Sequence, residues 1–356
     1  MKTLTSFYEG PFLHNLGRYY LDGKAGVKYF TFSCSGFDVS FVGTELHAHL
    51  TATECGKSQG EAGIAVLVDG ASFESAKTIF LAKPDADYVL IDRLPFGPHR
   101  VRVYKRTESA CSLTGWTRIG TDGYFIEGPK EPRLKIEFYG DSITAGNGSE
   151  GKPGDDDFVT RTENALISYA ALASEKLNAD FSIIAIGGFA VYKSPWNVEA
   201  GIKNVPQMFS FADCTWATNP GNAIPWDHSK FVPDVVVVNL GTNDDQYLLS
   251  LPQSDQPREG QRYLEAMNSF VSMIVATYLK TQVIVSIGMI KVSLVEKLLE
   301  ANMKNFGGHV HYLPFTSLSA GGYMPNGGHP NAAMHKAAAE ELTALIKSIL
   351  QKPIDK

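Results

Sequence analysis

The 356-residue chain has no long apolar run and no excess of positive charge. No segment approaches the roughly 20 apolar residues that a membrane-spanning helix requires. The N-terminus also lacks the continuous apolar stretch of a secretory leader, so we expect a soluble, cytoplasmic protein, although a trimmed secreted protein would begin in the same way. With a net charge of -6, the chain lacks the excess of basic residues that binding to nucleic acid or an anionic membrane usually requires.

Cysteine is also scarce, and its spacing excludes two kinds of site. The four cysteines form no C-x-x-C pair, which argues against a zinc knuckle or a redox motif: Cys34, Cys55, Cys111 and Cys214. Two His-x-His pairs occur, at His47 and His49 and at His309 and His311, but neither has a third ligand at metal spacing. We therefore expect no metal site.

The length exceeds the size at which one core usually keeps growing, so two domains are expected. Residues 1–127 contain short alternating segments, such as 37–41, 64–68 and 100–104, with turn signals between them, and this pattern predicts an all-β sandwich. Two prolines and several charges in residues 128–133 mark a linker.

Residues 134–356 change to apolar strands that alternate with helices. The predicted strands cover residues 136–139, 181–186, 234–240 and 282–287. Helical stripes run along Tyr263, Met267, Phe270, Ile274 and Tyr278, and along Ala338, Leu342, Leu345 and Ile349, with shorter helices over 163–178 and 293–304. This order predicts a three-layer α/β/α domain around a parallel sheet.

The first strand of that sheet ends in Gly140-Asp141-Ser142. In an open α/β sheet the carboxyl ends of the strands face the ligand, so Ser142 is the candidate nucleophile. A serine hydroxyl needs a base, and His329 lies on a glycine-rich loop, with Pro330 expected at the first position of the last helix. A helix-capping histidine is the alternative reading of His329.

Two further strand ends offer donors for an oxyanion. Gly188 follows the second predicted strand and Asn243 follows the third, although each alone is commonplace in a turn. Together, the Gly-Asp-Ser segment, Gly188, Gly241-Thr242-Asn243 and His329 resemble the SGNH (GDSL-type) hydrolase superfamily. Lys105–Glu108 and the segment from Thr162 to Ala171 extend the resemblance to the two-domain carbohydrate esterase family 2.

The resemblance implies a jelly-roll domain fused to an SGNH domain, and deacetylation of plant-polysaccharide fragments such as acetylated xylan without a metal or organic cofactor. It also implies that Ser142 is the nucleophile and His329 the base. The oxyanion hole would comprise the Ser142 N–H, the Gly188 N–H and the Asn243 amide. The family usually has an aspartate two or three residues before the histidine, where this chain has Gly327 and Asn326. We therefore expect a Ser142–His329 dyad oriented by a neutral oxygen.

Three of the four tryptophans lie in the long connection 189–231, and aromatic faces stack well on sugar rings. Trp196, Trp216, Trp226 and Tyr323 are therefore the candidates for contacting substrate, and the alternative is that each tryptophan only pins its loop. Hydrolysis of lipid or thioester acyl chains, or glycan binding by an inactive domain, are the rival functions. The oligomeric state stays open.

Overall fold

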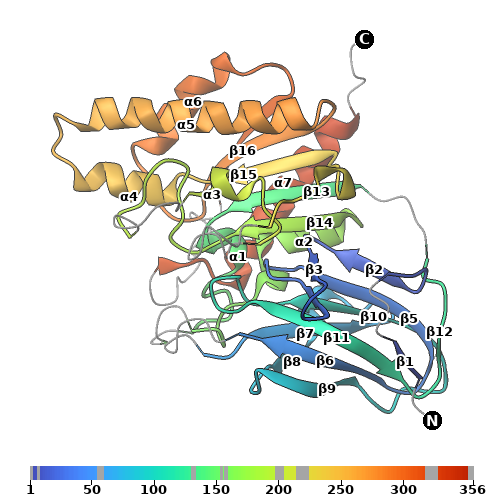
Figure 1. Cartoon of the computed structure of the whole chain (residues 1–356). Helices are drawn as coiled ribbons and strands as arrows, with labels where there is room; N and C mark the ends of the chain where they lie inside the picture. Colours follow the sequence, from blue (N-terminus) through green and yellow to red (C-terminus); the bar gives the residue numbers. More distant parts are fainter. Residues whose placement is uncertain are drawn as a thin grey trace.

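The computed structural model describes residues 3–5, 9–53, 60–129, 134–152, 155, 159–196, 204–213, 224–316 and 328–351. Figure 1 shows the N-terminal strands gathered in a β domain at the bottom and the helices and parallel strands above them.

The N-terminal domain consists of two antiparallel sheets. The first has the order β3 (Tyr20–Asp22), β4 (Val27–Tyr29), β11 (Thr114–Thr121), β6 (Leu46–Ala52) and β9 (Asp85–Ile91), and β1 (Thr3–Thr5) also pairs with β11. The second has the order β12 (Tyr124–Phe125), β5 (Gly36–Gly43), β10 (Gly97–Lys105), β7 (Gly63–Val68) and β8 (Lys77–Phe80), and β2 (Leu13–Leu16) also pairs with β5. A 3₁₀ turn, η1 (Phe73–Ser75), precedes β8.

The two sheets pack face to face around an apolar core to which both contribute, for example with Phe37 of β5 and Trp116 of β11. The second sheet is buried on its other face too. There Leu67 and Tyr104 join the core of the C-terminal domain. The predicted sandwich is confirmed, and one of its sheets is the surface on which the second domain rests.

The C-terminal domain is a parallel sheet with helices on both faces. The strand order is β14 (Asp180–Ala185), β13 (Lys135–Gly140), β15 (Val235–Asn239), β16 (Gln282–Gly288) and β17 (Val310–Phe315). One face carries α2 (Tyr169–Lys176) and α7 (Ala332–Gln351), and the other carries α4 (Thr242–Ser250), α5 (Gln256–Thr277) and α6 (Val295–Asn302). Shorter elements are α1 (Ser142–Ala145), α3 (Val205–Met208), η2 (Ala165–Ile167), η5 (His228–Lys230) and η6 (Met303–Asn305).

The predicted three layers are confirmed, and the burial pattern explains why the sequence revealed them. Val235 and Val237 of β15 point into one core and Val236 and Val238 into the other, as a strand covered on both faces requires. Every residue of the predicted α5 stripe is buried, including Tyr278 just after the helix. The strand β17 was not among the predicted ones.

Arg18, between β2 and β3, joins the two domains through a fully buried side chain. Its guanidinium donates to the Glu137 carboxylate of β13 at 3.2 Å and to the Tyr139 hydroxyl at 2.7 Å. It also donates to the carbonyl oxygens of Met208, Phe209 and Phe211, at 3.0, 2.9 and 2.7 Å. The segment after β2 is thereby fixed to both the sheet and the α3 region.

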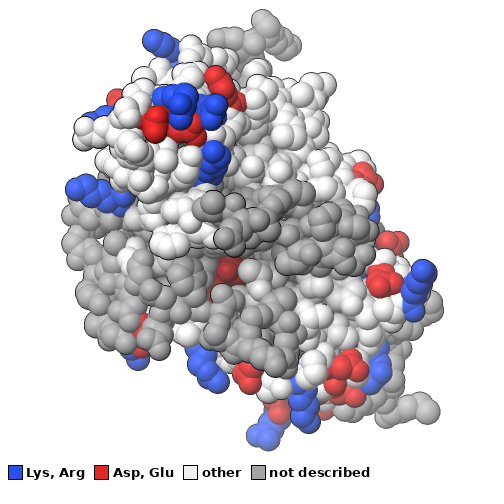
Figure 2. All heavy atoms as spheres, turned by 60° about the vertical axis from the view of Figure 1, so that its left-hand side comes forward, with Lys and Arg blue, Asp and Glu red and all other residues white. Residues whose placement is uncertain are grey.

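On the face seen in Figure 2, the charged groups of the described residues form small mixed clusters of both signs. Within the described ranges, no helix combines the length and the apolar character needed to cross a membrane.

Candidate active site

Ser142 lies where the winding of the sheet changes direction. Its strand, β13, has β14 on one side and β15 on the other, both parallel to it. Gly140 is in register with Ala185 and with Asn239, so the segments that follow these three strands leave the sheet at one level. In open α/β sheets, ligands bind at such a switch point. The topology therefore brings the predicted segments around Ser142, Gly188 and Asn243 together.

The nucleophile and base expected from the sequence are in contact. The Nε2 atom of His329 lies 2.8 Å from the Oγ atom of Ser142. Both side chains are nearly enclosed, at 7% and 8% exposure, so little water competes for this hydrogen bond. Ser142 begins the short helix α1, and the Asp141 carboxylate caps that helix by accepting from the Ile143 N–H at 3.0 Å. The cap fixes the backbone on which the hydroxyl stands.

His329 precedes α7, but the start of the helix differs from the prediction. The helix begins at Ala332, and Asn331 caps it by accepting from the Met334 N–H at 3.1 Å. Pro330 therefore lies before the cap and not at the first helical position, because the Asn331 side chain supplies the acceptor that starts the helix. Asn326 and Gly327, where the orienting group of the histidine was expected, lie outside the described residues.

The loop after β14 carries Gly188 in the left-handed conformation, with φ at 76°. Glycine adopts this conformation without the strain that a Cβ would add. The loop is held at both ends: the Phe189 N–H donates to the Ile186 carbonyl at 3.2 Å, and the Asn243 amide donates to the Phe189 carbonyl at 2.8 Å. The Asn243 amide also donates to the Asp141 carboxylate at 3.4 Å, next to Ser142 in the chain.

Glu108, which comes from the sandwich domain, also reaches this loop. Its carboxylate accepts from the Gly187 N–H at 2.5 Å. The sequence analysis used Lys105–Glu108 and the segment after Thr162 only as family signatures. In the structure the two segments contact each other: the Glu108 N–H donates to the Glu163 carboxylate at 2.5 Å, and Arg106 donates to the Glu163 carbonyl at 2.8 Å. The sequence analysis did not predict this contact between the two domains.

Several carboxyl groups around the site lie in buried surroundings of low polarity, which raise their pKa values. Burial, together with the charges of Asp244 and Glu108, raises the pKa of Asp141 to about 7. Burial raises the pKa of Glu163 to about 8, with Glu108 adding to the effect. Burial also raises the pKa of Glu108, although the Gly187 N–H and Lys105 favour its charged form. Ser142 thus stands in a region where dipoles and charges act strongly.

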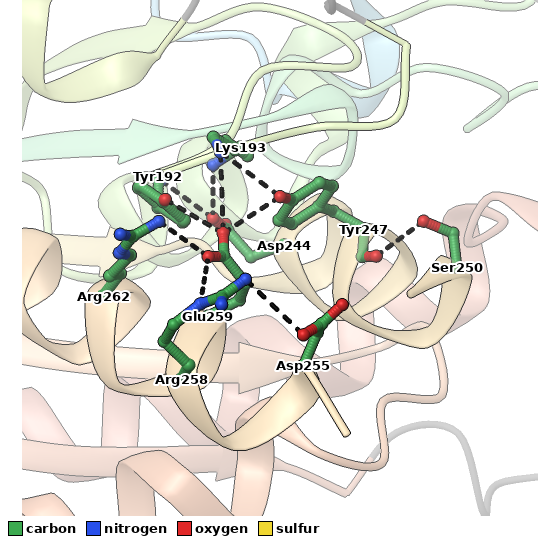
Figure 3. Close-up of polar contacts among 9 residues, drawn as sticks. All are labelled: Tyr192, Lys193, Asp244, Tyr247, Ser250, Asp255, Arg258, Glu259 and Arg262. Carbon is green, nitrogen blue, oxygen red and sulfur yellow. Dashed lines mark hydrogen bonds and ion pairs between the residues drawn. The ribbon is translucent and has the colours of Figure 1, made fainter. Parts of the chain in front are cut away.

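A second carboxylate pair fixes the continuation of the loop. Asp244 of α4 accepts from three successive backbone N–H groups, those of Val191, Tyr192 and Lys193, at 3.0, 2.8 and 3.1 Å. Figure 3 shows Glu259 of α5 at the centre of the neighbouring cluster of polar contacts. Its carboxylate accepts from the Tyr192 and Tyr247 hydroxyls at 3.1 and 3.0 Å. Burial opposes the charge of Glu259, but the hydrogen bonds from Tyr247 and Tyr192 lower its pKa to about 2. The loop is therefore anchored to both α4 and α5.

The aromatic candidates separate into two groups. Trp196 is 69% exposed and lies next to the Gly188 loop, since a Cβ built on Gly188 would be 3.8 Å from its ring. Trp226 is buried in a cluster with Tyr19 and Phe231, and the Arg18 guanidinium lies 5.4 Å from its ring centre. A ring so enclosed presents no face to a sugar, which corrects the expectation for Trp226. Trp216 and Tyr323 lie outside the described residues.

Comparison with known proteins agrees with this geometry. Residues 16–127 match the model of the carbohydrate esterase 2 N-terminal domain, and residues 138–337 match the GDSL-like lipase/acylhydrolase family. The chain belongs to carbohydrate esterase family 2. The predicted family and its two-domain fold are confirmed.

Two curated relatives and one solved structure illustrate the family. The chain is 28% identical over 349 residues to the cellulase/esterase CelE of Acetivibrio thermocellus, of which it spans 39%. It is 26% identical over 356 residues to an acetylxylan esterase / glucomannan deacetylase of Cellvibrio japonicus, of which it spans 89%. A family two carbohydrate esterase from Clostridium thermocellum, solved in complex with cellohexaose, is similar with a TM-score of 0.80 and 25% identity. That match covers 95% of this chain and 99% of the other.

Proposed function

We propose that the protein is a serine esterase that removes O-acetyl groups from plant-polysaccharide fragments, such as acetylated xylan or related oligosaccharides. The contact of 2.8 Å between Ser142 Oγ and His329 Nε2 at the switch point carries this proposal. The names of the relatives, an acetylxylan esterase / glucomannan deacetylase and a cellulase/esterase, support the substrate class.

The reaction would proceed through an acyl-enzyme. His329 takes the proton of Ser142 as the oxygen attacks the acetyl carbonyl, and the carbonyl electrons move to the oxyanion. The tetrahedral intermediate collapses when His329 returns the proton to the departing sugar oxygen. Water, deprotonated by the same histidine, then attacks the acetyl-serine and releases acetate and the serine hydroxyl.

The Ser142 N–H, the Gly188 N–H and the Asn243 amide would stabilise the oxyanion. One hydrogen of the Asn243 amide is already donated to the Phe189 carbonyl. The other hydrogen is donated to the Asp141 carboxylate over a longer distance, 3.4 Å, so we assign this hydrogen to the substrate oxygen, which would replace the weaker of the two bonds. Preorganised donors of this kind typically contribute about 10²–10³ in kcat each.

Trp196 is the described aromatic residue that we propose for sugar contact, because its ring is exposed beside Gly188. We also place the boundary between the domains at residues 128–133, which gives a sandwich of 1–127 and an esterase domain of 134–356. Residue 127 is also where the match to the family's N-terminal domain ends.

Ser142→Ala tests the proposal directly. We expect turnover of an aryl acetate to fall by at least about 10⁴-fold with the fold intact, since the nucleophile and base act as a unit. Ser174→Ala is the matched control: Ser174 is a buried serine of α2 whose hydroxyl donates to the Ala170 carbonyl, and its loss should leave turnover unchanged. Near wild-type turnover in Ser142→Ala would remove Ser142 from the mechanism.

The acyl group and the sugar are tested separately. We expect acetyl esters to be hydrolysed faster than octanoyl esters and acetate to be released from acetylated xylo-oligosaccharides. A preference for octanoyl esters would favour a lipid or thioester hydrolase instead. Oligosaccharide binding by a protein without esterase turnover would favour a glycan-binding module.

A further inference from the structure

The side chains of Glu108 and Ser142 both lie against Gly187, although Glu108 belongs to the other domain. Glu108 is 3% exposed and lies just beyond β10 of the sandwich. A Cβ built on Gly187 would lie 3.3 and 3.4 Å from its two carboxylate oxygens and 3.5 Å from the Cβ of Ser142. The carboxylate therefore stands against the loop at the point where the loop passes Ser142.

Glu108 is itself held rigidly. Its N–H donates to the Glu163 carboxylate at 2.5 Å, and its carbonyl accepts from the Lys105 ammonium at 2.6 Å. The ammonium is also bound to the Thr107 carbonyl at 2.7 Å. The Arg106 carbonyl accepts from the Ala165 N–H of the other domain at 3.0 Å. Contacts from both domains thus fix the backbone that carries this carboxylate.

The Gly187 N–H adjoins the group assigned to the oxyanion. Gly187 and Gly188 are consecutive, so the direction of the Gly188 N–H depends on the backbone rotation at Gly187. The peptide units on either side of the Gly187–Gly188 peptide are both fixed, by Glu108 at the Gly187 N–H and by the Ile186 carbonyl at the Phe189 N–H. If the carboxylate were removed, the Gly187 N–H would lose its acceptor in a partly buried site, and we expect the loop to turn to find another.

We propose that Glu108 is a positioning residue: by accepting from the Gly187 N–H, it holds the Gly188 N–H in the direction that an oxyanion requires. This inference rests on the esterase function proposed above. The sandwich domain then contributes to catalysis through one hydrogen bond, in addition to its packing.

Three variants of Glu108 test the inference. Glu108→Ala removes the acceptor, and Glu108→Asp keeps a carboxylate but withdraws it by one methylene. Because a misplacement of about 1 Å can cost about 10²-fold, we expect kcat for an aryl acetate to fall by about 10–100-fold in both, with KM nearly unchanged. Glu108→Gln retains an oxygen that can accept, so it should keep kcat within about fivefold.

A boronic acid that forms a tetrahedral adduct with serine provides the second readout, because its oxygen occupies the oxyanion position. Its affinity should fall in parallel with kcat in Glu108→Ala and Glu108→Asp. If Glu108 served folding alone, its replacement would change the melting temperature, but neither kcat per folded molecule nor the affinity for the boronic acid. Labelling of Ser142 by a fluorophosphonate, taken to completion, counts the intact sites, so kcat is expressed per folded molecule even where a variant folds poorly.

Glu175→Ala is the matched control. The Glu175 carboxylate of α2 accepts from the Phe73 N–H of the sandwich at 2.7 Å, so it makes the same kind of hydrogen bond between the domains. It lies at the end of α2 that leads into the start of β14, opposite the carboxyl ends of the strands. We expect kcat to be unchanged in this variant.

Unchanged kcat in Glu108→Ala or Glu108→Asp would overturn the inference. So would an equal loss in Glu108→Gln and Glu108→Ala, which would mean that the charge acts and not the acceptor. An effect confined to KM would also overturn it. The esterase proposal fails separately, if Ser142→Ala keeps its turnover.

Discussion

Replacing Arg18 by methionine would remove the buried guanidinium between the two domains while keeping most of the aliphatic stem. In the wild-type protein this group satisfies the Glu137 carboxylate, the Tyr139 hydroxyl and three carbonyl oxygens. Arg18 and Glu137 are both fully buried, so little water can replace the lost partner.

The expected loss follows from this geometry. Breaking a buried ion pair by removing one partner typically costs about 3–5 kcal/mol, because the other charge stays buried without compensation. We therefore expect Arg18→Met to lower the free energy of unfolding by about 4 kcal/mol. Adding Glu137→Gln removes the unpaired charge, and the Tyr139 and Tyr278 hydroxyls, now 2.7 and 3.3 Å from the carboxylate, can still donate to the amide oxygen. The double variant should consequently be more stable than Arg18→Met alone.

Urea unfolding, followed by tryptophan fluorescence and by circular dichroism, measures these differences. Trp226 gives a local signal, since its ring centre lies 5.4 Å from the Arg18 guanidinium. A loss below about 1 kcal/mol, the level of an exposed ion pair, would refute the reasoning. Strict additivity of the two substitutions would refute it as well, because residues in one network should couple.

Three further outcomes are expected. If a neutral main-chain oxygen orients His329, Asn326→Ala should lower kcat by less than about tenfold. Replacing a true triad carboxylate can lower kcat by about 10⁴-fold. A loss of several orders of magnitude would therefore contradict the dyad. Burial, with the charge of nearby His329, lowers the pKa of His335 from 6.5 to about 3. Between these two pH values the histidine is protonated in the unfolded chain but not in the folded protein, so the free energy of unfolding should fall as the pH drops from 6.5 to 3. His335→Asn should flatten this dependence in acid titrations of the melting temperature, and an unchanged slope would show that other groups cause it. Residues 134–356 expressed alone should be unstable or poorly active on polymeric substrate, because they lack Arg18 and Glu108, and a stable, fully active fragment would contradict the role given to the sandwich.

The sequence predicted the centre of the esterase domain because its signals there are local. The run from Val235 to Val238 reads as a strand buried on both faces, and the structure places it between β13 and β16. Ser142 and His329 were proposed from strand-end and loop positions, and their side chains lie 2.8 Å apart in the structure. The strand needed only neighbouring residues, whereas pairing the serine with the histidine also needed the family resemblance carried by Gly188 and Asn243.

Features at the edges and between the domains had no comparable signal. The edge strand β17 is only partly buried and contains Pro314, so its sequence lacks a continuous apolar run. Glu108 contacts Gly187 across 79 residues of chain, and no periodicity reports such a pairing. Trp226 shows the same limit: an aromatic residue in a long connection stacks on a ligand or packs in a core depending on the surface opposite it, here Arg18.

The buried arginine also affects how this protein can be recombined. A sandwich transplanted from a distant relative would have to present a cation at the position of Arg18, or the Glu137 carboxylate would be left uncompensated inside the hybrid. Chimeras joined at residues 128–133 should therefore fold only when the donor sandwich carries that cation. Although the chain consists of two domains, a change at Arg18 in one requires a matching change at Glu137 in the other, so the two domains should be exchanged, and should evolve, as a pair.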